Sequence, residues 1–301
     1  MKKTLAMMTA AVMVAGALAG CGSSSSTPAA TTAAATEAAT TAAATEAATT
    51  ETATTEAGDT AAAAEGTVKT PSGKFTVGFD QEFPPMGFVG DDGQFTGFDL
   101  DLAKEVASRL GLEFVPQPIN WDAKDMELDS GNIDCIWNGF TMQGREDDYT
   151  WVGPYMANNQ VFVVTADSDI ASKADLAGKA VEVQKDSSGL AALQGEAELS
   201  ASFGSMTEVA DYNTALMDLE SGACDAVCMD SIVAGYQIKS SGKDMKILDD
   251  TLSAEEYGIG FKKGEDELAK AVHDTLMDMK DDGTVAKISN DWFGSDVFTL
   301  K

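Results

Sequence analysis

The chain has 301 residues, with 49 acidic and 20 basic side chains and a formal net charge of −29 at pH 7. This balance argues against nucleic acids and anionic membrane surfaces as partners, because both are themselves negatively charged. The single histidine, His273, and the absence of a CxxC pair argue against a zinc or iron–sulfur site. We expect no metal and no cofactor.

The first twenty residues are predicted to be a secretion signal. The cationic start "MKK" precedes an apolar stretch of signal-peptide length, which is too short and too rich in small residues for a membrane span. The stretch ends in "LAGC", which resembles a bacterial lipobox. We therefore expect cleavage before Cys21 and lipidation of Cys21, with an ordinary signal and a chance cysteine as the alternative.

Residues 21–66 are predicted to be a tether. "TTAAATEAA" occurs at 31–39 and again at 40–48, and the region has no aromatic residue. Such a segment cannot bury enough apolar area to offset the entropy of ordering. As a coil, about 45 residues span roughly 40 Å, enough to hold a folded domain away from a membrane. A glycosylated stalk is the alternative.

Residues 67–301 alternate strand and helix patterns. "KFTVGF" at 74–79 is a strand pattern, and apolar residues four apart predict a helix from Phe98 to a stop at Gly111. Asp99 and Asp101 lie in the first turn of this helix, where the helix dipole favours anions. Further strands are expected at 112–116, 133–137, 160–166, 179–184, 206–209, 225–229 and 255–264, and further helices at 122–130, 189–200, 212–221 and in two C-terminal segments. The alternation predicts an α/β fold with open, mostly parallel, doubly wound sheets.

One segment is nearly repeated. "MELDSGNIDCIWNG" at 126–139 returns as "MDLESGACDAVCMD" at 217–230. Each copy predicts a helix, a Ser-Gly stop and a buried strand whose carboxyl end carries polar residues. Ligands of doubly wound sheets bind outside the carboxyl ends of the strands, so two copies indicate two sheets that share one cleft. Chance recurrence of a common helix–glycine–strand pattern is the alternative.

The cysteines beyond residue 66 are predicted to be buried thiols. They are Cys135, Cys224 and Cys228. The last two are four residues apart near one strand, a span of about 13 Å. A disulfide needs Cα atoms within roughly 7 Å, so this pair cannot form one.

An ordered set of motifs carries a resemblance to a known family. These are "VGFDQEFPPMGFVGDDGQFTGFDLDLAKEVASRLG", "DCIWNGFTMQGRED", "DLAGKAVEVQ", "EEYGIGFKKG" and "DDGTVAKISNDWFG". Together they resemble the amino-acid-binding proteins of ABC transporters, the bacterial extracellular solute-binding proteins of the polar amino acid type, over about residues 70–300.

The resemblance implies two doubly wound α/β lobes joined by two crossing strands, a periplasmic-binding-protein-like type II fold with the ligand in the interlobe cleft. Lobe 1 would comprise about 70–154 and 259–301, and lobe 2 about 160–254. The hinges would be at 154–159 and 255–258.

The resemblance also assigns ligand contacts residue by residue. Arg145 matches the arginine that binds the α-carboxylate, a role suited to a planar guanidinium with two parallel donors. Gly139 and Thr141 match positions that complete the carboxylate and ammonium contacts. Asp230, at the end of the second copy of the repeat, matches the acid that binds the ammonium.

The remaining expected contacts come from both lobes. Ser187 and Ser188 match positions that donate backbone N–H groups to the carboxylate near a helix start. Asp80 matches a position that bonds a polar or cationic side-chain end. Phe83 and Trp121 match aromatic positions that line the pocket, with ordinary core packing as the alternative. Further candidates are Asn138 and Gln184.

The implied function is a lipid-anchored extracellular receptor, monomeric and not an enzyme. It would bind a free amino acid, polar or basic, and deliver it to the permease and ATPase of an ABC importer at the outer face of the cytoplasmic membrane. One alternative is a cyclohexadienyl-type dehydratase on the same fold, with Asp80, Glu82 or Asp230 as its acid. The other is a surface lipoprotein without transport function.

Overall fold

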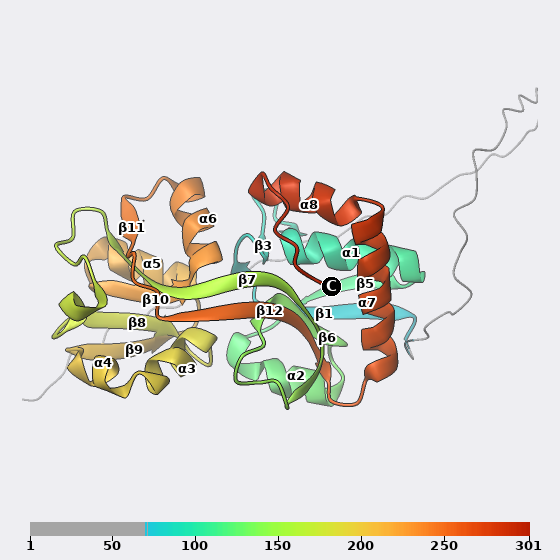
Figure 1. Ribbon diagram of the computed structural model, residues 1–301, viewed down its shortest axis with the longest axis horizontal. Coiled ribbons are helices and arrows are strands. Elements are labelled where there is room, and N and C mark those ends of the chain that lie inside the picture. Colours follow the sequence, from blue (N-terminus) through green and yellow to red (C-terminus); the bar gives the residue numbers. More distant parts are fainter. Residues whose placement is uncertain (1–69, 71) are drawn as a thin grey trace, which may run out of the picture. The chain divides into compact units, whose positions relative to one another are not determined.

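The computed structural model describes residue 70 and residues 72–301 (Figure 1). The signal peptide, the lipidation at Cys21 and the tether, which were predicted from the sequence, lie outside the described residues. Among the residues described, no helix is both long and apolar enough to cross a bilayer.

The elements of the first half are β1 (Lys74–Phe79), β2 (Glu82–Phe83), β3 (Gly87–Val89), β4 (Phe95–Thr96), α1 (Phe98–Leu110), β5 (Glu113–Pro118), η1 (Trp121–Ala123), α2 (Lys124–Ser130), β6 (Cys135–Thr141) and β7 (Tyr149–Thr165). Those that follow are η2 (Lys173–Leu176), β8 (Ala180–Gln184), α3 (Ser188–Gly195), α4 (Ala197–Ser202), β9 (Ser205–Val209), α5 (Tyr212–Ser221), β10 (Ala226–Asp230), α6 (Ser231–Ser241), β11 (Met245–Ile247), β12 (Ser253–Lys262), α7 (Asp266–Asp281) and α8 (Thr284–Phe293).

One hydrogen-bonded sheet runs through two α/β lobes, with strand order β5-β1-β6-β12-β7-β10-β8-β9 and β11 beside β7. Lobe 1 contains β1–β6, α1, α2, α7 and α8, and lobe 2 contains β8–β11 and α3–α6 (Figure 1). The strands β5, β1 and β6 are parallel, as are β10, β8 and β9. The two crossing strands, β7 and β12, are antiparallel to their neighbours. The mostly parallel pattern expected from the sequence is therefore confirmed within each lobe, but the crossing strands join the sheets of the two lobes into one.

Helices cover both faces of each half of the sheet, as the sequence predicted. In lobe 1, α1, α7 and α8 lie on one face and α2 on the other (Figure 1). The helix α1 buries Phe98, Leu102 and Val106 and ends at Gly111 in a left-handed conformation, with φ of 70°. Burying each such apolar side chain contributes about 1.5–3 kcal/mol, so this face of α1 stabilises the lobe 1 core.

Both copies of the repeat fold as the sequence predicted. The helices α2 and α5 end at Gly131 and Gly222, which have φ of 75° and 77°. The strands β6 and β10 that follow are buried along their whole lengths. Their carboxyl ends are the residues from which the candidate site is built. The three cysteines that the structure describes are free and buried, which confirms that prediction.

Several parts of the fold differ from the sequence-based expectation. The helix expected at 189–200 is two helices, α3 and α4. The strand β7 begins at Tyr149, not at residue 160, because Gly153 and Pro154 interrupt the apolar pattern without ending the strand. A separate small sheet, β2-β3-β4, was not expected. Its strands have only two or three residues, too few for an alternating pattern to be recognised.

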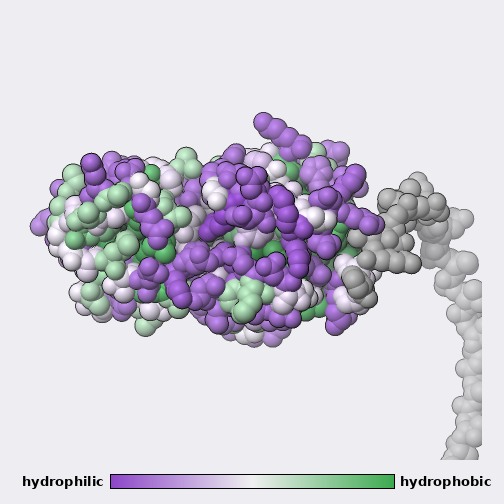
Figure 2. Space-filling view, turned by 90° about the horizontal axis from the view of Figure 1, so that it is seen from below, coloured by the Kyte–Doolittle hydropathy of each residue, from purple (hydrophilic) through white to green (hydrophobic). Residues whose placement is uncertain are grey.

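The surface reflects the acidic composition. Seen from below the view of Figure 1, hydrophilic residues are densest over lobe 1, whereas lobe 2 shows more residues of moderate hydrophobicity, and small strongly hydrophobic areas are visible on both (Figure 2). The most exposed large apolar side chains among the described residues include Met126 and Met217, at 66% and 64%. They occupy the same position in the two copies of the repeat.

Candidate functional site

A small cavity lies between the lobes, where β6 and β10 end. It is lined by Phe83, Trp121, Gly139, Thr141, Arg145, Gln184, Ser187, Ser188 and Asp230. Its volume is only about 10 Å³, since side chains from both lobes fill the space. In this conformation the cavity has no room for a molecule larger than water.

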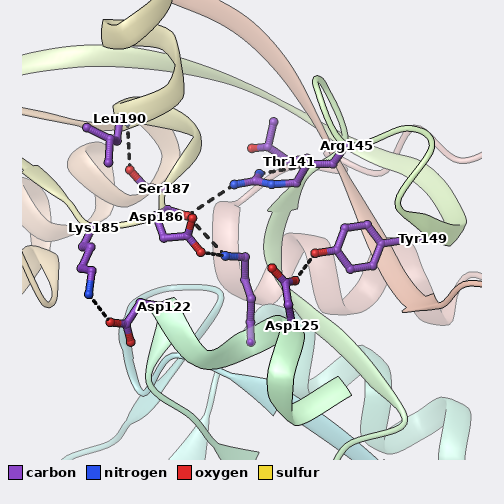
Figure 3. A network of polar contacts seen from close by, with 10 residues as sticks. Asp122, Asp125, Thr141, Arg145, Tyr149, Lys185, Asp186, Ser187 and Leu190 are labelled. Atoms are coloured by element: carbon purple, nitrogen blue, oxygen red, sulfur yellow. Dashed lines mark hydrogen bonds and ion pairs between the residues drawn. The ribbon is translucent and has the colours of Figure 1, made fainter. Parts of the chain in front are cut away.

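Arg145 follows β6 and faces lobe 2 (Figure 3). Its Nη1 donates to the carbonyl oxygen of Thr141 at 3.2 Å, and its Nη2 to that of Asp186 at 3.4 Å. The guanidinium lies 5.1 Å from the centre of the Phe140 ring. No carboxylate of the described residues pairs with it. Because a guanidinium has five N–H donors, Arg145 can still bind an anion.

The start of α3 faces Arg145 across the cleft. Ser187 is the N-cap residue, and its Oγ accepts a hydrogen bond from the N–H of Leu190 at 3.1 Å. Ser188 Oγ and Thr141 Oγ1 lie 3.2 Å apart, a polar contact that joins the two lobes. The first N–H groups of a helix have no partner within the helix, so this end of α3 suits a negative group.

Asp230 ends β10 and is 3% exposed. Its carboxylate accepts from Tyr257 Oη and Asn158 Nδ2, both at 2.7 Å, and from Tyr212 Oη at 3.3 Å. Burial, and then the nearby carboxylate of Glu255, raise the pKa of Asp230 to about 7. A bound cation would offset both effects and favour the ionised carboxylate.

Glu255 is a member of the site that sequence reasoning placed only in a hinge. It lies on β12 and is 6% exposed. Its Oε2 accepts from Thr141 Oγ1 at 2.9 Å, Gln160 Nε2 at 3.1 Å and Ser188 Oγ at 3.3 Å. The signal that could have identified Glu255 is an acidic residue in a strand pattern at the start of a predicted hinge.

Asp80 and Asn138 lie next to the cavity, not on its lining. Asp80 accepts from Gln184 Nε2 across the cleft at 2.7 Å, and burial raises its pKa to about 6. Asn138 was expected as a possible contact. It is 1% exposed, and its Oδ1 accepts from the N–H of Asp80 at 3.0 Å. Asn138 therefore connects β6 to the end of β1.

Aromatic side chains pack around the cavity from both lobes. The Phe83 ring is 5.8 Å from that of Tyr212 in lobe 2, measured between ring centres. The Trp121 ring packs edge-on against Phe140, at 5.6 Å between centres. Both residues line the cavity, and both also contact other side chains, so the two roles considered for them coexist.

Asp99 does not line the cavity but binds the backbone of Gly139, which does. It lies in the first turn of α1, as predicted, but its side chain is fully buried. Its Oδ2 accepts from the N–H of Gly139 at 2.7 Å and from Tyr155 Oη at 2.8 Å. Burial raises the pKa of Asp99 to about 7. The helix-dipole interpretation missed this contact because it joins residues that are far apart in the sequence.

A larger groove of about 1030 Å³ opens beside the cavity. Its acidic lining residues are Asp80, Glu82, Asp122, Glu127, Glu208 and Asp211. Lys185 also lines it, and its Nζ pairs with Asp122 at 2.7 Å. The groove therefore favours positively charged groups.

Comparison with known proteins identifies the family. The model of the bacterial extracellular solute-binding proteins, family 3, matches residues 75–295. The chain belongs to this family. Its two α/β lobes and crossing strands are accordingly the periplasmic-binding-protein-like fold of type II, as the sequence predicted.

Individual relatives of this family 3 protein are amino-acid-binding proteins by name. An L-cystine-binding protein of Escherichia coli is 32% identical over 231 residues, covering 75% of this chain and 84% of the relative. An arginine-binding extracellular protein of Bacillus subtilis is 30% identical over 226 residues, covering 73% and 86%. A solved ABC uptake substrate-binding protein from Streptococcus pneumoniae with bound histidine is 34% identical and superposes with a TM-score of 0.74, covering 76% of this chain and 96% of that one.

Proposed function

We propose that this protein binds a free amino acid between its lobes and delivers it to an ABC importer. The observation that carries the proposal is the charge arrangement of the cavity. Arg145 reaches it from lobe 1 without a carboxylate partner among the described residues, and Asp230 reaches it from lobe 2 with neutral partners only. A zwitterion carries the complementary pair of charges. The names of the relatives support the same conclusion.

In this proposal, Arg145, Thr141 and the start of α3 bind the α-carboxylate, and Asp230 binds the ammonium. Because these groups stand on different lobes, one ligand satisfies them all only when the lobes are closed. The hinges are proposed at 154–159 and 255–258. In support, these two segments pair directly in the sheet, with Glu255 opposite Asn158 and Tyr257 opposite Met156. Closure about such hinges is a common ligand response.

The preferred ligands are proposed to be glutamine and amino acids with a positively charged side chain. The acidic groove supports this preference, because it lies where a long side chain would leave the cavity. Asp80 would contact the side-chain end. Relatives that bind arginine and histidine support a basic ligand. A relative that binds cystine supports a long polar side chain without net charge. Acidic amino acids are expected to bind least well.

Calorimetry tests the proposed binding directly. The purified protein would be unfolded and refolded to remove co-purified ligand, then titrated with each of the twenty amino acids and with cystine. Micromolar or tighter binding of one or a few is expected. Failure of all of them to bind would overturn the proposal. Turnover of a cyclohexadienyl acid by the same preparation would favour the dehydratase alternative over a protein that is not an enzyme.

The location is also a proposal. We propose that lipid on Cys21 anchors a monomer to the outer face of the cytoplasmic membrane, either at the cell surface or facing a periplasm. The "LAGC" motif and the extracellular or periplasmic names of relatives support this. Cys21→Ala is expected to release the protein from membranes in cell fractionation. Continued labelling of that variant by a radioactive fatty acid would contradict the anchor.

A further inference from the structure

Lys124 connects the lobes outside the cavity. It is the first residue of α2 in lobe 1 and is 2% exposed. Its Nζ forms an ion pair with the carboxylate of Asp186 in lobe 2 and lies 3.4 Å from the carbonyl oxygen of Asp186. It also lies 5.3 Å from the centre of the Trp121 ring. Neither Lys124 nor Asp186 lines the cavity.

Asp186 has an unusual backbone conformation. Its φ is 57°, and it is the only non-glycine residue with positive φ among the described residues. Side chains of L-amino acids disfavour this left-handed region, and residues held in it cluster at functional sites. Asp186 separates β8 from α3, so its conformation directs its carboxylate toward lobe 1 (Figure 3). The carbonyl oxygen of the same residue accepts from Arg145.

A second interlobe ion pair provides a contrast. Lys185 and Asp122 have side chains that are 56% and 40% exposed, and such surface pairs contribute little because water and salt screen them. In the other pair, Lys124 is buried, although Asp186 is half exposed. Separating the lobes would remove the anionic partner of Lys124 and give its ammonium access to water, so the pair favours closure by the excess of its attraction over that hydration. The two bridges therefore predict different effects on lobe closure.

We propose that Lys124 and Asp186 form an interlobe latch, which favours the closed lobes and thereby sets the affinity of the ligand site. Both are positioning residues, since neither lines the cavity. The effect on affinity rests on the proposed function, because a ligand that needs closed lobes binds in proportion to their population. The effect on closure itself does not depend on any ligand.

The test measures lobe closure without ligand. Fluorophores would be attached to cysteines that replace the exposed Lys104 of lobe 1 and Glu198 of lobe 2, in protein carrying Cys21→Ala. The three remaining cysteines are buried and do not compete for label. Single-molecule energy transfer would then give the ratio of closed to open molecules.

Four variants are compared with the wild type. Lys124→Met removes the charge and keeps the length of the side chain. Asp186→Asn also removes charge, and asparagine tolerates the left-handed conformation. Their double variant completes a thermodynamic cycle, and Lys185→Met is the control for the exposed bridge. Should Lys124→Met not fold, Asp186→Asn carries the test, since that side chain is half exposed.

We expect each latch variant to lower the closed-to-open ratio at least threefold, and the double variant to lower it no further. Lys185→Met should leave the closed-to-open ratio, measured without ligand, within twofold of wild type. Amino-acid affinity should fall in parallel, through faster dissociation. The latch would be overturned if either single variant kept a closed-to-open ratio within twofold of wild type. It would also be overturned if the effects of the two substitutions on that ratio added in the double variant. Absence of amino-acid binding by the wild type would refute the proposed function and leave the closure measurement decisive for the latch.

Discussion

At the scale of single residues, the proposed ligand site rests on Arg145 and Asp230. Each is a charged side chain at the cavity without a partner of opposite charge among the described residues, and each comes from a different lobe. Neutral hydrogen bonds hold both in place. This arrangement fixes the side chains before ligand arrives and leaves their charges available. Two predictions follow from their chemistry.

Arg145→Ala is expected to lower amino-acid affinity by at least about a hundredfold, because the α-carboxylate would be desolvated without its charged partner. Arg145→Lys should retain part of the affinity, since an ammonium supplies the charge but not two parallel donors. Calorimetry on both variants gives the comparison. Tight binding by Arg145→Ala would remove Arg145 from the carboxylate site.

Affinity should also depend on pH through Asp230. An ammonium binds the ionised carboxylate, and burial with the neighbouring Glu255 raises the pKa of Asp230 to about 7. Below that pH a proton must first be displaced, so affinity should fall by up to about tenfold per pH unit between pH 7 and pH 5. Asp230→Asn should bind weakly and with a smaller dependence, because Asp80 still titrates near pH 6. Calorimetry at pH 5, 6, 7 and 8 measures the slope, and a flat profile for the wild type would contradict the assignment.

At the scale of elements, the strand β6 brings the site to the cleft, and its path depends on Gly139. This residue has φ of 58°, and its N–H donates a hydrogen bond to Asp99 Oδ2. A Cβ at this position would lie 2.9 Å from the Phe83 ring and 3.1 Å from the Tyr257 ring. Both rings are buried, so neither has room to move.

Gly139→Ala is therefore expected to destabilise the protein by about 3 kcal/mol and to weaken ligand binding, through left-handed strain and overpacking together. Gly131→Ala is the matched control. Gly131 has φ of 75°, but a Cβ there meets nothing within 4 Å, so only strain of about 1 kcal/mol is expected. Denaturant unfolding of both variants measures the difference. Equal losses would show that packing at Gly139 does not matter.

Elements with strong local signals were predictable from the sequence. Apolar residues four apart and a terminal glycine located α1 within one residue, and the Ser-Gly stops located the ends of α2 and α5. The strand ends indicated a shared cleft, and the resemblance to the family supplied the individual residues expected there. The contact of Asp99 with Gly139 and the pairing of Lys124 with Asp186 join residues 40 and 62 positions apart. No local sequence pattern predicts such contacts, because they form only when segments that are distant in the sequence pack together.

At the scale of the whole molecule, buried acids couple folding to pH. Folding raises the pKa of Asp80 to about 6 and that of Asp99 to about 7, chiefly through burial. The unfolded chain ionises these groups near pH 4, so the folded form binds protons that the unfolded form releases. Their contribution to stability is complete below about pH 4 and is lost as the pH rises through 6 and 7.

The midpoint of thermal unfolding is therefore expected to rise by several degrees as the pH is lowered from 8 to 5. Relief of repulsion within the net charge of −29 acts in the same direction. Asp99→Asn should reduce the dependence, because the amide oxygen can still accept from Gly139 but cannot titrate. Calorimetric scans at four pH values provide the measurement. A midpoint that falls steadily toward pH 5 would contradict the assignment of these pKa values.

The order of the strands in the sheet affects how the chain can fold while it is being synthesised. Lobe 1 combines β1–β6 with α7 and α8, which follow lobe 2 in the chain. The strand β6 lacks one of its neighbours in the sheet until β12 is synthesised. The core also lacks Leu300, which follows α8 and is 2% exposed. A nascent chain thus emerges from the ribosome with lobe 1 unfinished, whereas lobe 2 is nearly contiguous. In the export that the signal sequence predicts, a channel that threads unfolded polypeptide would receive lobe 1 before that lobe can fold.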